Sequence, residues 1–295
     1  MKRLIKKRLF YPIAKIFPTK LFLKIMYKRN LGKKLNFKNP QTLNEKIQWK
    51  KIYDKNPLYT VCADKYCVRD YIKEKIGEKY LIPLLYSTDN PSSINFGELK
   101  FPCILKSSHG SAHIIILKNK KYINKRQIIK KCKKWLKTNY YWVGREPQYK
   151  NIKPLILIER LLLDEKGKIP HDYKFYCFNG KVEFIQVNKD RFGESKFNIF
   201  NKYWESTQFT YAPKEVSKEK RDKNIAEPKN LKKMIKVAEK LSKDFDFARV
   251  DLYSVNNKIY FGEITFHPGS GFCVFLPSKY DLIYGKKLKL KGHQK

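Results

Sequence analysis

Residues 171–181, which read HDYKFYCFNGK, identify a β-hairpin in the second half of the chain. Asn179-Gly180 separates two runs of high strand propensity, 171–178 and 181–187, and Asn-Gly is the strongest short-range signal for a hairpin turn. Side chains alternate between the two faces of a strand. The first strand therefore places Asp172, Lys174 and Tyr176 on one face and Tyr173, Phe175 and Cys177 on the other.

A second pair of strands is predicted downstream of this hairpin. Residues 247–253 and 259–265 are rich in apolar residues and are joined through Asn256 and Asn257. The remaining elements are expected to be helices at 38–53, 59–76, 125–138 and 229–243, and strands at 81–86, 101–106, 114–117 and 155–162. Because hairpins mix with helices in no regular alternation, the sequence predicts an α+β protein rather than a doubly wound sheet.

The composition bounds the class of protein. Hydrophobic residues make up 42% of the 295, which provides enough apolar surface for a packed core and excludes wholesale disorder. No apolar run approaches the roughly 20 residues that a bilayer span requires. The first nine residues lack the apolar core of a secretory signal, and the six cysteines form no C-x-x-C pair. Free thiols and a cytoplasmic location are therefore expected.

The net charge of +38 raises the question of a nucleic-acid partner. The basic residues are 55 Lys and 10 Arg. Proteins that read bases or grip phosphates bidentately favour Arg, so no specific nucleic-acid partner is expected.

The most local basic feature is the N-terminal arm, residues 1–35, in which Lys and Arg interleave with apolar residues. Two interpretations are open. The arm is either a surface helix that rests on anionic lipid at the inner face of the membrane, or a pair of short helices, broken near Pro18, that pack on the body of the protein.

Two carboxylates, Asp251 and Glu263, fall on the second pair of strands. With a three-residue loop they would face each other with Cβ atoms about 5 Å apart, and so close a pair requires a compensating cation such as Mg²⁺. Arg249 lies on the same face. Two alternatives remain: a two-residue turn that would separate the acids, and a simple ion pair between Arg249 and Asp251.

Lys106 precedes a small-residue loop, SSHGS at 107–111, whose backbone N–H groups could fold over a polyphosphate. The loop does not match the P-loop pattern. His109 and His113 are four residues apart, but they lie across a loop, where the helical zinc geometry does not apply.

Seven motifs follow one another in a characteristic order. They are LNFKNPQTLNEKIQW (35–49), DKYCVRDYI (64–72), ILKSSHGSAH (104–113), LIERLL (157–162), HDYKFYCFNGK (171–181), ARVDLY (248–253) and GEITFHPGSG (262–271). Together they resemble the ATP-grasp superfamily, and most closely its TupA-like branch, which is named for teichuronopeptide biosynthesis and found among bacterial surface-polysaccharide genes.

The resemblance implies an ATP-grasp fold in which two α+β subdomains hold a nucleotide between them. The expected division is a basic amphipathic N-terminal arm (1–35), a helical pre-grasp region (36–100), a small ATP-grasp subdomain (101–160), a large subdomain with the metal site (161–276) and a basic C-terminal tail (277–295).

The resemblance also implies ATP and Mg²⁺ as cofactors and assigns roles to residues. Lys65 and Lys106 match lysines that contact the ATP phosphates, the strand that ends at Glu159 resembles the hinge that meets adenine, and Lys174 and Arg191 match positions near the γ-phosphate. We therefore predict catalytic residues Lys174, Arg191 and Arg249, cofactor-binding residues Lys65, Lys106, Ser108, Gly110, Ser111, Glu159 and Asp172, and metal ligands Asp251 and Glu263.

The implied function is an ATP-dependent carboxylate–amine ligase that modifies a bacterial surface or capsular polysaccharide precursor, with a uronic acid as the acceptor class. Two departures from the family pattern are Thr265, where many ATP-grasp enzymes carry an Asn metal ligand, and the short region before Lys106. The alternatives are a glycosyltransferase that uses a nucleotide-sugar, with Asp244-Phe245-Asp246 as its D-x-D motif, and a non-catalytic basic adaptor at the membrane.

Overall fold

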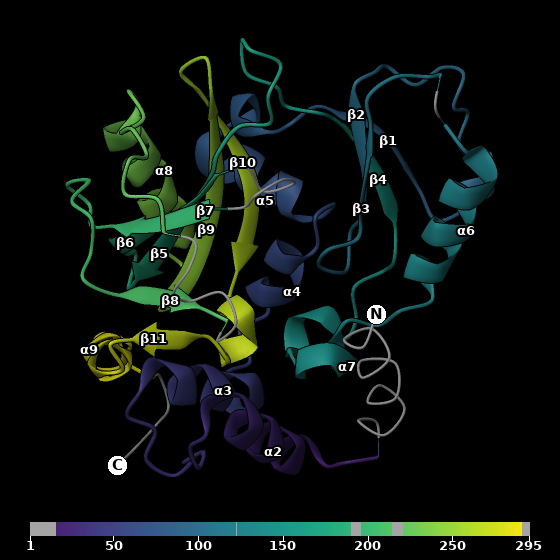
Figure 1. Ribbon diagram of the computed structural model, residues 1–295. Coiled ribbons are helices and arrows are strands. Elements are labelled where there is room, and N and C mark those ends of the chain that lie inside the picture. The colour runs from purple at the N-terminus through teal and green to yellow at the C-terminus, as the bar shows by residue number, and fades with distance from the viewer. Residues whose placement is uncertain (1–15, 122, 190–195, 214–220, 291–295) are drawn as a thin grey trace.

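The computed structural model describes residues 16–121, 123–189, 196–213 and 221–290 (Figure 1). These residues form a four-stranded, a five-stranded and a two-stranded sheet, and the strands of each sheet pair antiparallel. Helices lie around and between the sheets. The predicted α+β class is confirmed.

The four-stranded sheet has the order β1-β4-β2-β3, from β1 (Leu84–Thr88), β2 (Cys103–Ser107), β3 (Ile114–Leu117) and β4 (Ile156–Arg160). Helix α6 (Lys125–Leu136) covers one of its faces by burying Ile128 and Cys132. A short 3₁₀ turn, η2 (Pro91–Ser93), follows β1. Because β1 pairs with β4, the expected boundary at residue 100 between a helical region and the small subdomain is wrong.

The five-stranded sheet has the order β10-β9-β5-β6-β7, from β5 (Asp172–Phe178), β6 (Lys181–Lys189), β7 (Lys196–Phe200), β9 (Phe247–Val255) and β10 (Lys258–Thr265). The Asn179-Gly180 turn has positive φ at both residues, as the hairpin prediction requires. Tyr173, Phe175 and Cys177 join the core under α8 (Leu231–Ser242), whereas Asp172 and Lys174 point to the opposite face. The predicted alternation is confirmed.

A third layer closes the bottom of the molecule in Figure 1. Strands β8 (Thr210–Ala212) and β11 (Val274–Leu276) pair, and α9 (Lys279–Lys287) packs on β11 and on α3 (Leu43–Tyr53). Thr42 and Glu45 form a capping box at the start of α3. Asn44 bonds Asp281 in α9 by its backbone and side-chain nitrogens, each at 3.0 Å. Residues 277–290 are therefore part of the body, and the expected basic tail is wrong for them.

The helix expected at 59–76 is in fact two helices, α4 (Leu58–Ala63) and α5 (Val68–Ile76). Asp64 ends α4 with an extended backbone, and its carboxylate accepts a hydrogen bond from the N–H of Tyr66 at 2.8 Å. Such Asx turns compete with the helix. A 3₁₀ turn, η1 (Glu78–Tyr80), follows α5, and Figure 1 shows α4 and α5 between the two large sheets.

Helix α2 (Thr19–Leu31) begins directly after Pro18, where the sequence predicts a break. Its residues Phe22, Leu23 and Tyr27 are buried in a cluster with Leu35. The packing interpretation of the arm therefore holds for α2, and residues 1–15 lie outside the described part of the chain. In the described residues, the helices are all too short or too polar to cross a bilayer.

Candidate active site

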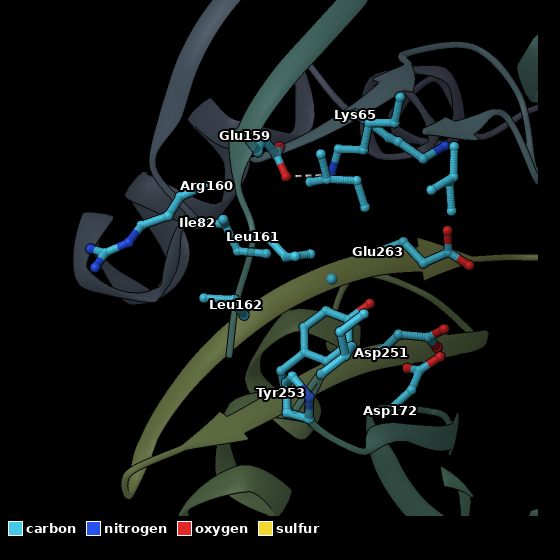
Figure 2. A pocket seen from close by; sticks show the side chains of 16 residues that line it. Lys65, Ile82, Glu159, Arg160, Leu161, Leu162, Asp172, Asp251, Tyr253 and Glu263 are labelled. Carbon is cyan, nitrogen blue, oxygen red and sulfur yellow. Dashed lines mark ion pairs between the residues drawn. The ribbon is translucent and has the colours of Figure 1, made fainter. Parts of the chain in front are cut away.

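A cleft of about 820 Å³, including its open mouth, lies between the four-stranded and five-stranded sheets. Strands of both sheets line the cleft, as do the segment 160–162 after β4 and residue 65 between α4 and α5. Figure 2 shows charged side chains at one end and mostly apolar ones at the other.

The apolar end of the cleft is suited to a flat, uncharged group. The apolar residues that line the cleft are Ile82, Ile104, Ile114, Leu161, Leu162, Ile169, Pro170 and Tyr253. Figure 2 shows Leu161, Leu162 and Tyr253 around this end, whereas the side chain of Arg160 points away from the cleft. The chain that leaves β4 after Glu159 therefore forms one wall of the cleft.

At the charged end, Asp251 and Glu263 are direct neighbours across β9 and β10. The turn between these strands has two residues, Asn256 and Asn257, both at positive φ, which is the shorter of the two turns that the sequence left open. The register shifts by one residue between Phe261 and Glu263, which leaves Gly262 as the extra residue of a β-bulge. The bulge brings the two acids together despite the short turn.

Arg249 and Lys174 neutralise these carboxylates. Arg249 donates from Nε to Asp251 Oδ1 at 2.6 Å and from Nη2 to Glu263 Oε1 at 2.7 Å. Lys174 Nζ lies 2.6 Å from both Asp251 Oδ2 and Asp172 Oδ2. The predicted Arg249–Asp251 ion pair is thus present together with the facing acids. Burial raises the pKa of Asp251, and the charges of Arg249 and Lys174 oppose that rise.

Lys65 and Lys106 enter the cleft from the opposite side. Lys106 Nζ forms an ion pair with Glu159 Oε2 at 2.6 Å, and Lys65 Nζ donates to the carbonyl oxygen of Gly110 at 2.6 Å. The break between α4 and α5 lets the backbone N–H of Lys65 bond to Ser108 at 3.1 Å, and burial lowers the pKa of its ammonium group. Both lysines therefore face the carboxylates of the other sheet across the cleft.

The loop after Lys106 is fixed largely by its own side chains. Ser108 Oγ accepts from the N–H of Leu155 at 3.0 Å and donates to the carbonyl oxygen of Lys153 at 3.2 Å. The buried hydroxyl of Ser108 is thus a loop anchor in this structure, whereas Ser111 is exposed. His113 stacks on Trp135, and His109 Nε2 bonds the Trp135 carbonyl oxygen at 3.0 Å, so neither histidine is arranged as a zinc ligand.

The structure thus gathers most of the predicted site residues around one cleft. Lys65, Lys106, Glu159, Asp172, Asp251 and Glu263 line it, and Lys174 and Arg249 reach it through their ion pairs. Arg191 lies outside the described residues.

A family model described as TupA-like ATPgrasp matches residues 45–289 of the chain. The chain belongs to this family. The predicted resemblance is therefore confirmed, and the match covers all of the described site residues. A comparison with curated proteins found no match.

Solved structures similar to this TupA-like ATP-grasp protein include two of D-alanine–D-alanine ligase from Bacillus anthracis. One has 15% sequence identity and a TM-score of 0.42, covering 70% of this chain and 57% of that one. The other, complexed with ATP, has 16% identity and a TM-score of 0.43, covering 70% and 55%. An L-amino acid ligase from Bacillus licheniformis has 13% identity and a TM-score of 0.46, covering 83% and 55%. The chain spans little more than half the length of these structures.

The sequence motifs of this TupA-like protein gave no role to Lys51, which is buried next to the site. Its Nζ donates to the carbonyl oxygen of Gly144 and to the carbonyl oxygen and Oγ of Ser270, each at 2.8 Å. These bonds use all three protons of the ammonium group. Gln48 adds bonds to the carbonyl oxygens of Ser270 and Gly271, each at 2.9 Å. Helix α3 thereby fixes the loop that follows Glu263 and Thr265.

The loop held by α3 has an unusual backbone. Within η4 (Pro268–Gly271), Ser270 has a φ of +57°, which is unfavourable for a residue with a Cβ. A Cβ on Gly144, which ends α7 (Tyr141–Gly144), would collide with Ser270 Oγ. The sequence signals for this contact were the position of Lys51 in the predicted helix, just after the first motif, and the glycines of the last motif, but nothing in the sequence joined them.

Two buried groups complete this cluster of Lys51 and Ser270. Glu146 lies just before η3 (Pro147–Tyr149), and burial raises the pKa of its carboxyl group. His267 Nδ1 lies 3.9 Å from Glu146 Oε2, and burial keeps the pKa of His267 well below its usual value. A neutral histidine therefore lies beside Glu146, and the positive charge of Lys51 opposes the rise in the pKa of Glu146.

Proposed function

We propose that the cleft binds ATP with Mg²⁺ and that the protein is a carboxylate–amine ligase. The observation that carries this proposal is the division of one cleft into an apolar end and a charged end, with Lys65 and Lys106 facing Asp251 and Glu263. The apolar end suits adenine, the lysines suit the phosphates, and the carboxylates suit a divalent cation.

The donor set fits Mg²⁺, which prefers oxygen ligands and retains waters or phosphate oxygens. Asp251 and Glu263 would hold the ion, and Thr265 donates to Glu263 Oε1 at 3.1 Å, which orients that carboxylate. In the described residues, no group of three acidic, His or Cys side chains forms a complete metal site. The nucleotide phosphates would therefore supply the remaining ligands. When bound, the ion would offset the negative charge of the transferred phosphoryl group.

The proposed reaction has two steps. A carboxylate oxygen of the substrate attacks the γ-phosphorus of ATP, the bond to the β,γ-bridging oxygen breaks, and ADP leaves. An amine nitrogen then attacks the acyl carbon of the acylphosphate, inorganic phosphate leaves, and the nitrogen loses a proton. Lys65 and Lys106 would position the phosphates, and Arg249 and Lys174 would stabilise charge on the transferred group, with Arg191 as an additional predicted contact.

We propose a uronic-acid-containing precursor of a bacterial surface polysaccharide as the carboxylate, and an amino acid or amino sugar as the amine. This part rests on the TupA-like family and its association with teichuronopeptide biosynthesis. We also propose that the protein acts in the cytoplasm, where both the nucleotide and the precursor are available.

The glycosyltransferase alternative receives no support from its D-x-D motif. Asp246 is buried and paired with Lys50, and Asp244 Oδ2 lies 2.8 Å from Lys75 Nζ. Asp246 thus pairs with a lysine of α3 and Asp244 with a lysine of α5. Neither acid lines the cleft.

The deciding experiment compares nucleotides in a thermal-shift assay and then measures ADP release. ATP with Mg²⁺ should raise the melting temperature, and UDP-sugars should not. Lys106→Met should abolish the ATP shift, whereas Lys130→Met, at an exposed position of α6, should keep it. A shift with UDP-sugars and none with ATP would favour the glycosyltransferase.

A further inference from the structure

Helix α2 has apolar side chains on two opposite sides. Phe22, Leu23 and Tyr27 are buried against the body of the protein. Leu21 and Ile25 are on the other side and are 44% and 41% exposed. Phe17, just before the helix, is 37% exposed. Since residues four apart share a helix face, Leu21 and Ile25 form one outer stripe.

Basic side chains flank the outer stripe. Lys24 and Lys28 are exposed, and their spacing of three residues from Leu21 and Ile25 places them beside these side chains. Residues 1–44 contain thirteen Lys and Arg and no Asp or Glu. The outer face of α2 therefore combines exposed apolar groups with positive charge.

We infer that α2 docks on an anionic membrane surface through its outer stripe. Leu21 and Ile25 would enter the boundary between headgroups and acyl chains, while Lys24 and Lys28 would lie among anionic headgroups. A lipid surface offers both an apolar layer and negative charge, so it complements both features of this face. A soluble polyanion offers the charge alone and would leave the apolar stripe in water.

The position of α2 in the fold supports docking. Figure 1 shows α2 at the periphery, below α3 and away from the two large sheets. Its buried residues hold the helix in place, so docking would not require the helix to form from a disordered chain. Arg145 anchors the start of the helix by donating to the carbonyl oxygen of Phe17 at 3.0 Å.

Helix α6 is also strongly basic, but its surface differs from the outer face of α2. Residues 118–137 contain ten Lys and Arg and no acid, and Lys130 and Lys134 are exposed at the same spacing as Lys24 and Lys28. The apolar residues Ile128 and Cys132 are buried under the helix. Helix α6 thus offers charge without an exposed apolar stripe, and serves as a matched control on another part of the molecule.

The test is co-sedimentation of the full chain with vesicles of phosphatidylcholine, with and without phosphatidylglycerol, at about 50 and about 500 mM salt. The wild-type chain should bind the anionic vesicles at low salt and lose most of that binding at high salt. Leu21→Gln/Ile25→Gln should weaken binding at least tenfold. Lys24→Gln/Lys28→Gln should weaken it by a similar factor, and Lys130→Gln/Lys134→Gln by no more than about twofold.

Each variant should melt within a degree or two of the wild type, since all six positions are exposed, and a melting curve verifies that loss of binding is not loss of fold. Binding that is unchanged in the folded Leu21→Gln/Ile25→Gln variant would overturn the inference, as would equal losses in the α2 and α6 lysine variants. A chain that binds no vesicles, but binds a soluble anionic glycan through Leu21 and Ile25, would show that this face binds glycan instead. ATP turnover on soluble acceptors is measured separately, so the outcome does not depend on the proposed ligase activity.

Discussion

Asp251 and Glu263 face each other across β9 and β10 because Gly262 is an extra residue in β10. The two-residue turn alone would pair Asp251 with position 262. The bulge also brings backbone to the floor of the cleft, since a Cβ on Gly262 would lie 3.0 Å from the carbonyl oxygen of Asp251 and 3.1 Å from the ring of Tyr253. Gly262 lines the cleft, and a side chain there would crowd the backbone of Asp251 and the ring of Tyr253.

The first prediction concerns this floor. Gly262→Val should destabilise the protein by about 1–3 kcal/mol through overpacking, and it should weaken the ATP-induced thermal shift more than a substitution in the exposed turn, such as Asn257→Gly. Isothermal calorimetry with ATP and Mg²⁺ measures the binding part. Equal nucleotide affinity in both variants would show that Gly262 does not border the bound nucleotide.

The second prediction separates the two acids. The sequence suggests that removing either carboxylate would relieve repulsion and stabilise the metal-free protein, but Arg249 and Lys174 already neutralise the pair. Asp251→Asn leaves Lys174 and Arg249 buried with less compensation, so it should destabilise by about 3–5 kcal/mol. Glu263→Gln, at a side chain 38% exposed, should change stability by less than about 1 kcal/mol. Both should lower turnover at least a hundredfold, as single-turnover kinetics on folded protein can verify.

The third prediction is a pH dependence. Burial, with smaller effects of His109 and Lys65, lowers the pKa of His113 to about 4, whereas the unfolded chain titrates near the ordinary value of about 6.5. Between these values the unfolded state binds the proton and the folded state does not. His113 therefore lowers the free energy of unfolding as the pH falls from 6.5 towards 4.

The size of this effect is roughly 2 kcal/mol between pH 7 and pH 5. Urea unfolding of the wild type and of His113→Gln at both pH values measures the contribution of His113. His109 is present in both proteins, so its contribution is common to both. A parallel pH dependence in the two proteins would remove His113 as the source.

The fourth prediction tests the contact between α3 and the loop after β10. Lys51→Met removes three hydrogen bonds and leaves Glu146 without its buried counter-charge, so it should destabilise by about 3 kcal/mol or more. Lys55→Met, at an exposed position just after the same helix, should have an effect within about 0.5 kcal/mol. Chemical denaturation measures both, and similar values would show that Lys51 is not essential to the loop.

The fifth prediction compares the two sides of α2. Leu23→Ala creates a cavity at a fully buried position and should destabilise by about 2–5 kcal/mol. Leu21→Ala, two residues earlier and exposed, should change the free energy of unfolding by less than about 0.5 kcal/mol. A large loss from Leu21→Ala would mean that another segment covers the outer stripe.

Local signals in the sequence were sufficient for most elements of the fold. The Asn-Gly turn, the alternation along β5, the capping box of Thr42 and the apolar spacing of α8 depend on neighbours within a few residues, so they can be recognised without a structure. The order of the motifs was sufficient to predict the family. Where a local competitor was overlooked, as with Asp64 inside the supposed helix at 59–76, the prediction was wrong.

Only the tertiary structure decided how distant residues meet. A bulge changes register without changing the strand pattern, so the pairing of Asp251 with Glu263 could not be told from spacing. Lys51 and Ser270 are 219 residues apart, and their contact depends on how α3 packs against η4. The sequence determined which groups the protein has and in which local element each one lies. Packing between elements decided which charges neutralise one another. The energy of an ion pair depends on the distance between its charges, and here the paired residues are far apart in the sequence.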